Sequence, residues 1–282
     1  MIGGIEAGGT KFVCAVGDRE GEIFDKISLP TVEPEKTLQA VNQFFHHYSI
    51  EALGVGSFGP INLDTREDTY GTILNTPKIE WKHFDLLGRL KADFEVPVYL
   101  DTDVNAACLG EYLYGAGRDS ASVLYITIGT GIGAGFVHNG RTYQGKSHPE
   151  MGHIFVRKQD NDKFAGACPY HGNCLEGLAS GTAIEQRTGV RGHLLPSHDE
   201  IWDLEAYYLA QAVTNYMMIL SLERIILGGG VMKQKKMYGM IRSKVREFVN
   251  DYVPIGDVDK LIVAPELENE QGVKGAMALV TG

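Results

Sequence analysis

The chain has 282 residues, of which 44% are hydrophobic and 22% charged, and its formal net charge is −10. This length suits two domains and this composition suits a globular protein. The negative charge would repel a nucleic-acid backbone, and the apolar stretches are interrupted well before the roughly 20 residues of a bilayer span. We therefore expect no nucleic-acid or membrane partner and, with no leader pattern at the N-terminus, a cytoplasmic protein.

The predicted elements alternate between strands and helices along the chain. Apolar runs of strand length, broken by glycine or polar turns, predict strands at 2–7, 11–16, 52–56, 96–100, 123–128, 134–137 and 224–227. Apolar residues at helical spacing predict helices at 37–48, 86–94, 104–112 and 204–221, and a last helix that starts near residue 271. This alternation predicts layers of an α/β protein.

Two distant stretches share one layout, in which a glycine turn joins two apolar runs. The first turn is 8–10 and the second is 129–133, and each pattern predicts a β-hairpin. The repetition suggests two related halves, each with its own sheet. We expect an N-terminal lobe of residues 1–115, joined by a C-terminal helix at about 270–282, and a second lobe of residues 116–269.

Three glycine-rich turns are candidate contacts for a nucleotide. In the first, Glu6 to Lys11, the glycines let the backbone approach a phosphate, the Thr10 hydroxyl can donate to it, and the lysine adds positive charge. The second is Gly129–Gly133, and the third, Gly228–Gly230, would suit a flat group such as adenine. Each turn alone could be an ordinary glycine turn, but three together favour a nucleotide cradle.

Asp103 lies where a predicted strand ends and a predicted helix begins. One interpretation is an ordinary helix N-cap. In the other, the carboxylate lines the crevice at the carboxyl end of a sheet, and the helix N-terminus keeps it ionised as a base for a hydroxyl proton. Phosphoryl transfer would otherwise need positioning, Mg²⁺ and charge stabilisation. Both interpretations stay open at this point.

A dense group of cysteine and histidine lies in the second half of the chain. Cys168, His171 and Cys174 fall within one short loop, and His153 lies upstream of it. Four such ligands suit a tetrahedral Zn²⁺ ion. A disulfide between the two cysteines is the main alternative, although such bonds are rare in cytosolic proteins.

Taken together, these motifs resemble the ROK family (repressors, open reading frames, kinases), and within it the fructokinase branch. The matching segments lie along almost the whole chain, at 6–11, 101–107, 129–133, 150–153 and 168–176. The resemblance implies a duplicated actin/hexokinase-like (ribonuclease H-like) α/β fold with two lobes and an interdomain cleft. It also implies ATP-dependent phosphorylation of a hexose, with catalytic Mg²⁺ and structural Zn²⁺.

The resemblance implies a role for each motif, with Asp103 as the general base. ATP and its phosphates would contact Glu6, Gly8, Gly9, Thr10, Lys11, Thr130, Gly131, Gly228 and Gly229. The sugar would contact Asn105, Glu150, His153 and Glu176, and the zinc ion would be held by His153, Cys168, His171 and Cys174. The two glutamates flank the zinc ligands, where they can accept hydrogen bonds from sugar hydroxyls. The alternative is that each of the two glutamates is an ordinary solvated charge on the surface.

Two departures from the family pattern favour fructose over glucose. Thr102 stands where many ROK glucokinases have asparagine, and the zinc loop is shorter and contains His171. We expect the conversion of D-fructose and MgATP to fructose 6-phosphate and ADP, by a homodimer. The alternatives are a glucokinase, mannokinase or N-acetylhexosamine kinase of the same family, or a sugar sensor without turnover.

Overall fold

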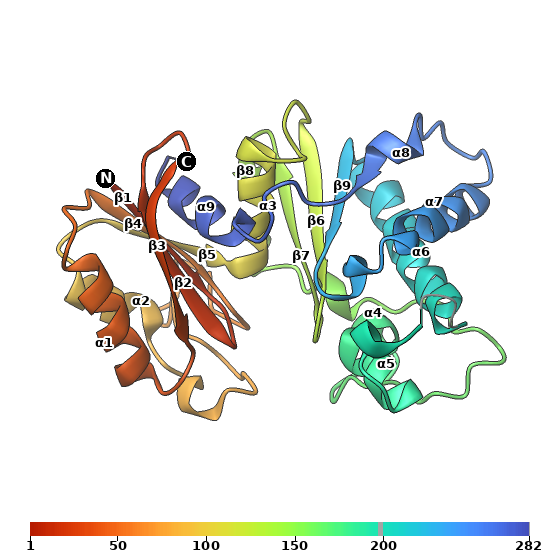
Figure 1. Cartoon of the computed structure of the whole chain (residues 1–282), viewed down its shortest axis with the longest axis horizontal. Coiled ribbons are helices and arrows are strands. Elements are labelled where there is room, and N and C mark those ends of the chain that lie inside the picture. Colours follow the sequence, from red (N-terminus) through yellow and green to blue (C-terminus); the bar gives the residue numbers. More distant parts are fainter. Residues whose placement is uncertain (197–199, 282) are drawn as a thin grey trace. The chain divides into compact units, whose positions relative to one another are not determined.

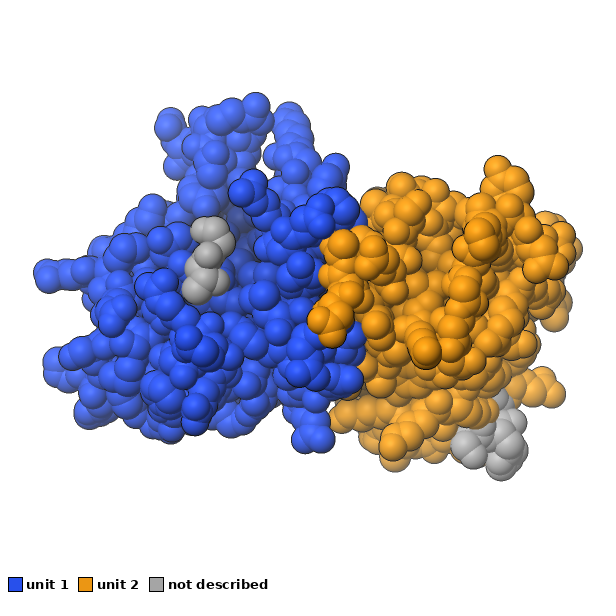
Figure 2. Space-filling model, turned by 90° about the horizontal axis from the view of Figure 1, so that it is seen from above, with its two compact units in different colours: residues 1–118, 135–149, 266–282 blue, residues 119–134, 150–265 orange. Residues whose placement is uncertain are grey.

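The computed structural model of the protein describes residues 1–196 and 200–281. They form two compact units (Figure 2). Unit 1 comprises residues 1–118, 135–149 and 266–282, and unit 2 comprises residues 119–134 and 150–265. Residues 135–149 thus belong with unit 1, whereas the expected division had placed them in the second lobe. Within the described residues, no helix is both long enough and apolar enough to cross a membrane.

The first sheet has the strand order β3-β2-β1-β4-β5. Its strands are β1 Ile2–Ala7, β2 Lys11–Gly17, β3 Ile23–Pro30, β4 Ala52–Ser57 and β5 Val98–Thr102. The first three strands are antiparallel, whereas β4 and β5 run parallel to β1. β3 was not predicted, because it is an edge strand with mostly exposed side chains and no apolar periodicity.

Four helices cover this sheet. They are α1 Pro34–Phe45, α2 Leu86–Asp93, α3 Asp103–Tyr114 and α9 Gln271–Ala278. Figure 1 shows α1 and α2 against one face of the sheet, and α3 and α9 against the other. α1 begins earlier than predicted because Pro34 occupies its first turn, where a proline costs no hydrogen bond.

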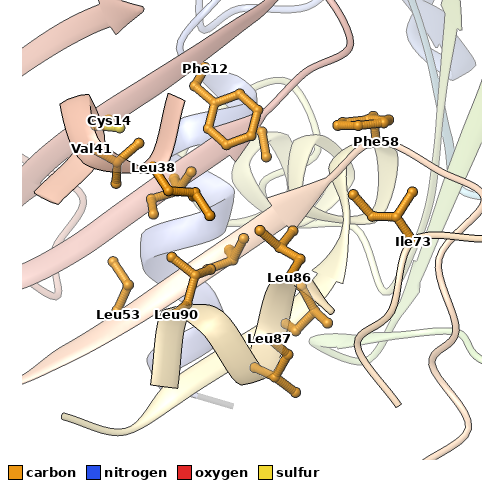
Figure 3. Packing of buried hydrophobic residues seen from close by; sticks show 14 of the residues in the cluster. Phe12, Cys14, Leu38, Val41, Leu53, Phe58, Ile73, Leu86, Leu87 and Leu90 are labelled. Carbon is orange, nitrogen blue, oxygen red and sulfur yellow. The ribbon is translucent and has the colours of Figure 1, made fainter. Parts of the chain in front are cut away.

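The alternation of side chains along β1 and β2 divides the core of unit 1 into two. One face buries large side chains against α1 and α2 (Figure 3); among them are Ile5, Phe12, Cys14, Leu38, Val41, Leu86 and Leu90. The other face is smaller and consists of Ile2, Ala15, Ala52, Val273 and Met277. The last two come from α9, so the C-terminal helix completes a core that the N-terminal strands begin.

Glycines allow α9 to lie directly against α3 and the sheet. A Cβ atom added to Gly275 would lie 1.6 Å from the carbonyl oxygen of Ala106 in α3. One added to Gly54 in β4 would lie 1.8 Å from the carbonyl oxygen of Ala276. Both distances are far below contact, so only glycine fits at these two positions.

The second sheet has the strand order β10-β9-β6-β7-β8. Its strands are β6 Ser122–Ile128, β7 Ile132–His138, β8 Arg141–Thr142, β9 Arg224–Gly228 and β10 Ile262–Val263. The helices of unit 2 are α4 Leu175–Ala179, α5 Gly181–Thr188, α6 Ile201–Leu220, α7 Lys236–Val249 and α8 Val258–Leu261. The predicted hairpin, long helix and strand at 123–137, 204–221 and 224–227 correspond to β6–β7, α6 and β9.

Gly275→Ala should destabilise the protein, because its methyl group would overlap the backbone of α3. Overpacking of this kind costs about 1–3 kcal/mol and more where backbone must move. Gly239→Ala is the matched control, since Gly239 lies inside α7 and an added Cβ meets no atom within 4 Å. Alanine there should be neutral or stabilising by up to about 1 kcal/mol. Thermal and urea unfolding test this contrast, and equal midpoints for the two variants would contradict it.

Candidate active site

The first glycine turn joins β1 to β2 in unit 1. The amide of Gly8 donates to the carbonyl oxygen of Lys11 at 3.0 Å, and this bond closes the turn. The Thr31 hydroxyl, which follows β3, donates to the carbonyl of Gly8 at 2.7 Å and fixes the turn from the side. A Cβ on Gly9 would meet no atom within 4 Å, and Thr10 is exposed. The turn is therefore fixed by hydrogen bonds at Gly8, whereas Gly9 and Thr10 at its tip are accessible.

Glu6 lies near the end of β1, next to the first turn of α9. A Cβ on Gly272 of that turn would lie 2.3 Å from the Glu6 Cδ, so the carboxyl group packs directly against the helix N-terminus. Burial raises the pKa of the Glu6 carboxyl above its ordinary value, and the positive charge of Lys11 partly opposes this. The structure thus brings Glu6, Lys11 and the open hairpin together.

Asp103 is the first residue of α3 and directly follows β5. The N-cap is Thr102, whose Oγ1 accepts a hydrogen bond from the Asn105 amide at 3.2 Å. Asp103 therefore does not hold the capping position. Its own Oδ1 accepts from the Val104 amide at 2.9 Å, and the residue is half-buried. This is the strand-to-helix position that the sequence predicted for the carboxylate.

A second carboxylate, Asp101, is buried at the end of β5 and is only 2% exposed. It accepts from the Thr102 amide at 2.7 Å, from the Asn105 side-chain amide at 2.8 Å and from the Thr142 hydroxyl at 2.7 Å. The Gln144 side chain also hydrogen-bonds to it. Burial raises the pKa of Asp101, and these hydrogen bonds oppose that rise. Asn105, predicted to contact the sugar, is completely buried and uses its amide on this carboxylate.

The second glycine turn joins β6 to β7. Gly129 donates its amide to the carbonyl of Gly131 at 2.9 Å, which closes the turn. The start of α5 holds it from outside: the Gly181 amide donates to the Gly129 carbonyl at 2.7 Å, and the Thr182 hydroxyl donates to the Thr130 carbonyl at 2.8 Å. Both hairpins are thus fixed by hydrogen bonds to their carbonyl groups from a neighbouring segment.

The third glycine turn follows β9 and lies beside the second. β9 runs parallel to β6, and Thr127 pairs with Gly228. Gly229 has a φ of 90°, and a Cβ there would lie 2.4 Å from the Ile128 carbonyl oxygen. A larger residue is therefore excluded on two counts. The structure brings the second and third glycine turns together in unit 2, while the first belongs to unit 1.

Glu176, in the first turn of α4, reaches the second glycine turn. Its Oε2 accepts from the Ile132 amide at 2.9 Å, and a Cβ on Gly131 would lie 2.5 Å from the same oxygen. Its Oε1 is 3.9 Å from Nε2 of His153. Glu150 is exposed as a residue, but partial desolvation of its carboxyl group raises the pKa of that group; His153 opposes the rise and the negative charge of Glu176 adds to it. Three of the four predicted sugar contacts therefore gather in unit 2.

The cluster of His153, Cys168, His171 and Cys174 is assembled, with its ligand atoms all within 4.8 Å of one another. The His153 Nδ1 lies 3.5 Å from the Cys174 Sγ and 3.8 Å from the Cys168 Sγ, which is 3.7 Å from the His171 Nδ1. Ligands of tetrahedral zinc lie about 3.3–3.8 Å apart, given bonds of about 2.0–2.3 Å. Both cysteines are free thiols. The donor set and its spacing therefore fit a zinc ion.

The surroundings of Cys174 raise the pKa of its thiol to about 11. Burial is the largest cause, Cys168 and Glu176 add to it, and a hydrogen bond from the Gly177 amide opposes it. Thiolates are the form that binds zinc, so zinc binding at this cluster would release protons from the cysteines. His153 presents Nδ1 to the sulfurs and Nε2 to Glu176, and it thus connects the cluster to a predicted sugar contact.

The sequence analysis missed three residues that contact Asp101 and Thr102, just before α3. Thr142 and Gln144 bind Asp101, and the Nδ1 of His148 lies 3.5 Å from the Thr102 Oγ1. They come from residues 135–149, which carry no recognisable motif before Glu150. The only available signal was the position of a histidine two residues before a predicted sugar contact.

These features define a sugar-kinase type of protein. Both sheets have glycine turns at strand ends, an aspartate lies at a strand-to-helix junction, and a Cys/His cluster lies in unit 2. The sequence matches the ROK family over residues 2–282, and the chain belongs to this family.

Curated relatives and solved structures agree with this assignment. A fructokinase from Streptococcus mutans is 44% identical, with 99% of this chain and 97% of that protein aligned. A fructokinase from Pediococcus pentosaceus is 43% identical, over 99% of this chain and 97% of the relative. A ROK family glucokinase from Streptomyces griseus, solved in complex with glucose and AMPPNP, has a TM-score of 0.75 and is 25% identical, over 100% of this chain and 99% of that one. The two-domain ROK fold is therefore that of this chain.

Proposed function

We propose that this protein transfers the γ-phosphoryl group of MgATP to the C6 hydroxyl of D-fructose, giving fructose 6-phosphate and ADP. Similarity to fructokinases over nearly the full length supports the substrate. The observation that carries the chemistry is Asp103 at the first position of α3, beside the buried Asp101 network. That the protein is a homodimer and that it is cytoplasmic stay predictions.

Asp103 accepts the proton of the C6 hydroxyl as that oxygen attacks the γ-phosphorus. The bond from this phosphorus to the β–γ bridging oxygen breaks, and ADP leaves with its electron pair. Lys11 and the open end of the first hairpin, with Gly8, Gly9 and Thr10, bind phosphate oxygens. Mg²⁺, when bound with ATP, neutralises phosphate charge, and Glu6 would hold it through water.

Unit 2 supplies the other contacts of the proposed reaction. Thr130 and Gly131 of the second glycine turn bind phosphates, and Gly228 and Gly229 lie against adenosine. The carboxylates of Glu150 and Glu176 accept hydrogen bonds from sugar hydroxyls, and Nε2 of His153 lies beside them. Asn105 is reassigned from sugar binding to positioning, because it is buried and hydrogen-bonded to Asp101.

Asp103→Asn should keep the fold and sugar binding but lose the base. Removing a general base costs about 10²–10⁴-fold in kcat, with little change in the KM for fructose. Asp251→Asn, at an exposed position in unit 2, is the control and should leave kcat unchanged. A coupled ADP-release assay measures both variants. Turnover of Asp103→Asn within threefold of the wild type would remove Asp103 from the proposed mechanism.

Fructose should be the preferred acceptor among hexoses. The measurement is kcat/KM for fructose, glucose, mannose and N-acetylglucosamine at saturating MgATP. We expect fructose to exceed glucose by at least about tenfold, a difference of about 1.4 kcal/mol in transition-state binding. A tenfold preference for glucose would instead make the protein a glucokinase. ATP-independent binding of sugar without ADP release would identify a sensor.

The purified protein should contain one zinc ion per chain, bound by the four Cys/His residues. Four protein ligands leave no open position, so the ion would be structural and would not contact the transferred phosphate. A strong chelator should lower both the thermal midpoint and the affinity for fructose. Added Zn²⁺ should restore both and Mg²⁺ neither, since Mg²⁺ prefers oxygen ligands. Full fructose affinity in metal-free protein would show that the ion is dispensable.

A further inference from the structure

We infer that His148 is a specificity-determining contact for the acceptor sugar, oriented by Thr102. This inference rests on the proposed function, because it assigns a further residue to the sugar site of that reaction. The contact that points to it lies within unit 1, where the His148 Nδ1 is 3.5 Å from the Thr102 Oγ1. Thr102 immediately precedes the proposed base, so the imidazole lies at the N-terminus of α3, beside the reacting group.

We assign the tautomer of His148 from the hydrogen bonds of Thr102, with the Thr102 hydroxyl as the donor to Nδ1. Its Oγ1 already accepts from the Asn105 amide at 3.2 Å, which leaves its hydroxyl proton free to be donated. His148 Nδ1 is the acceptor within reach. The ring proton is then on Nε2, at the side of the ring turned away from Thr102.

The His148 ring is neutral in the physiological range. Burial lowers the pKa of His148 to about 4, so above that pH the ring carries a single N–H donor and no charge. A neutral N–H suits an uncharged oxygen, such as a sugar hydroxyl or the anomeric oxygen of a ketose. It would add no charge next to the carboxylate that must accept a proton.

The segment that carries His148 is fixed at its beginning and at its end. Thr142 and Gln144 hydrogen-bond to the buried Asp101, which anchors the start of the segment below α3. Pro149 follows His148 directly and restricts its backbone to extended conformations. The segment that carries the imidazole is therefore anchored by the same carboxylate that hydrogen-bonds to Asn105 of α3.

A purely structural histidine would behave differently from a sugar contact. Thr102 caps α3 without it, because the cap is the bond from Asn105. Loss of His148 should then have little effect on the helix and a specific effect on the sugar. In this arrangement Thr102 offers the ring a single hydroxyl donor, whereas an asparagine at this position would add N–H donors of its own. The pair is therefore the part of the site to which we assign the predicted preference for fructose.

The test measures binding and turnover for His148→Ala, His148→Gln and wild type. Isothermal titration with fructose and steady-state kinetics should show that His148→Ala weakens fructose binding and raises its KM by about 5- to 100-fold, the range expected for one lost hydrogen bond. The KM for ATP should change by less than twofold. His148→Gln, which keeps an N–H donor, should recover part of the affinity. His47→Ala, at an exposed histidine after α1, is the control and should match the wild type.

The outcomes separate this inference from the proposed function. If wild type prefers another hexose, the proposed substrate is wrong, and the same titrations with that hexose still decide the role of His148. Unchanged hexose affinity in His148→Ala would overturn the inference, as would equal losses of ATP and hexose affinity that track a lower thermal midpoint. Thr102→Ser, which keeps the hydroxyl, should preserve the preference for fructose over glucose. Thr102→Val should reduce that preference at least threefold, and failure of this contrast would remove the orienting role of Thr102.

Discussion

The buried carboxylate of Asp101 connects three parts of unit 1 that are distant in the sequence. It accepts hydrogen bonds from the Thr102 amide at the end of β5 and from the Asn105 side chain of α3. Thr142 and Gln144, which follow β7 in the sequence, also hydrogen-bond to it. An ionised group removed from water costs several kcal/mol unless hydrogen bonds replace its hydration, so every one of these donors matters. These bonds hold the start of α3 against the end of β5, and Thr102 and the proposed base Asp103 lie where the two meet.

In unit 2, the stretch that leads into the Cys/His loop has little hydrophobic support. Every residue from 153 to 167 is partly or fully exposed, so this stretch contributes little to a hydrophobic core. The Cys/His cluster lies at its two ends, and His153 reaches from the cluster toward Glu176. Glu176 in turn binds the Ile132 amide next to the second glycine turn, where Gly131 leaves it room. The proposed ion would thus order a polar loop that packing alone would leave loose.

The parts of the protein that were predicted from the sequence depend on local patterns. Apolar periodicity located the hairpins and most of the helices, and close ligand spacing located the Cys/His cluster. The strand β3 was missed because an exposed edge has no apolar pattern, and the return of residues 135–149 to unit 1 was missed because only tertiary contacts determine it. Family resemblance suggested a sugar contact for Asn105, and the structure adds a contact that the sequence did not indicate, the hydrogen bond from its Nδ2 to Asp101.

The packing of α9 against the first sheet has a consequence for folding during translation. Ile2 and Ala15 are translated long before Val273 and Met277, the residues of α9 that cover them. At about 5–20 residues per second, this apolar face waits roughly 15–55 s for its partner. Glu6 beside the first glycine turn waits equally long for the first turn of α9. A ribosome-bound chain therefore exposes an apolar surface and an unsupported Glu6, and both are covered only once α9 has been translated.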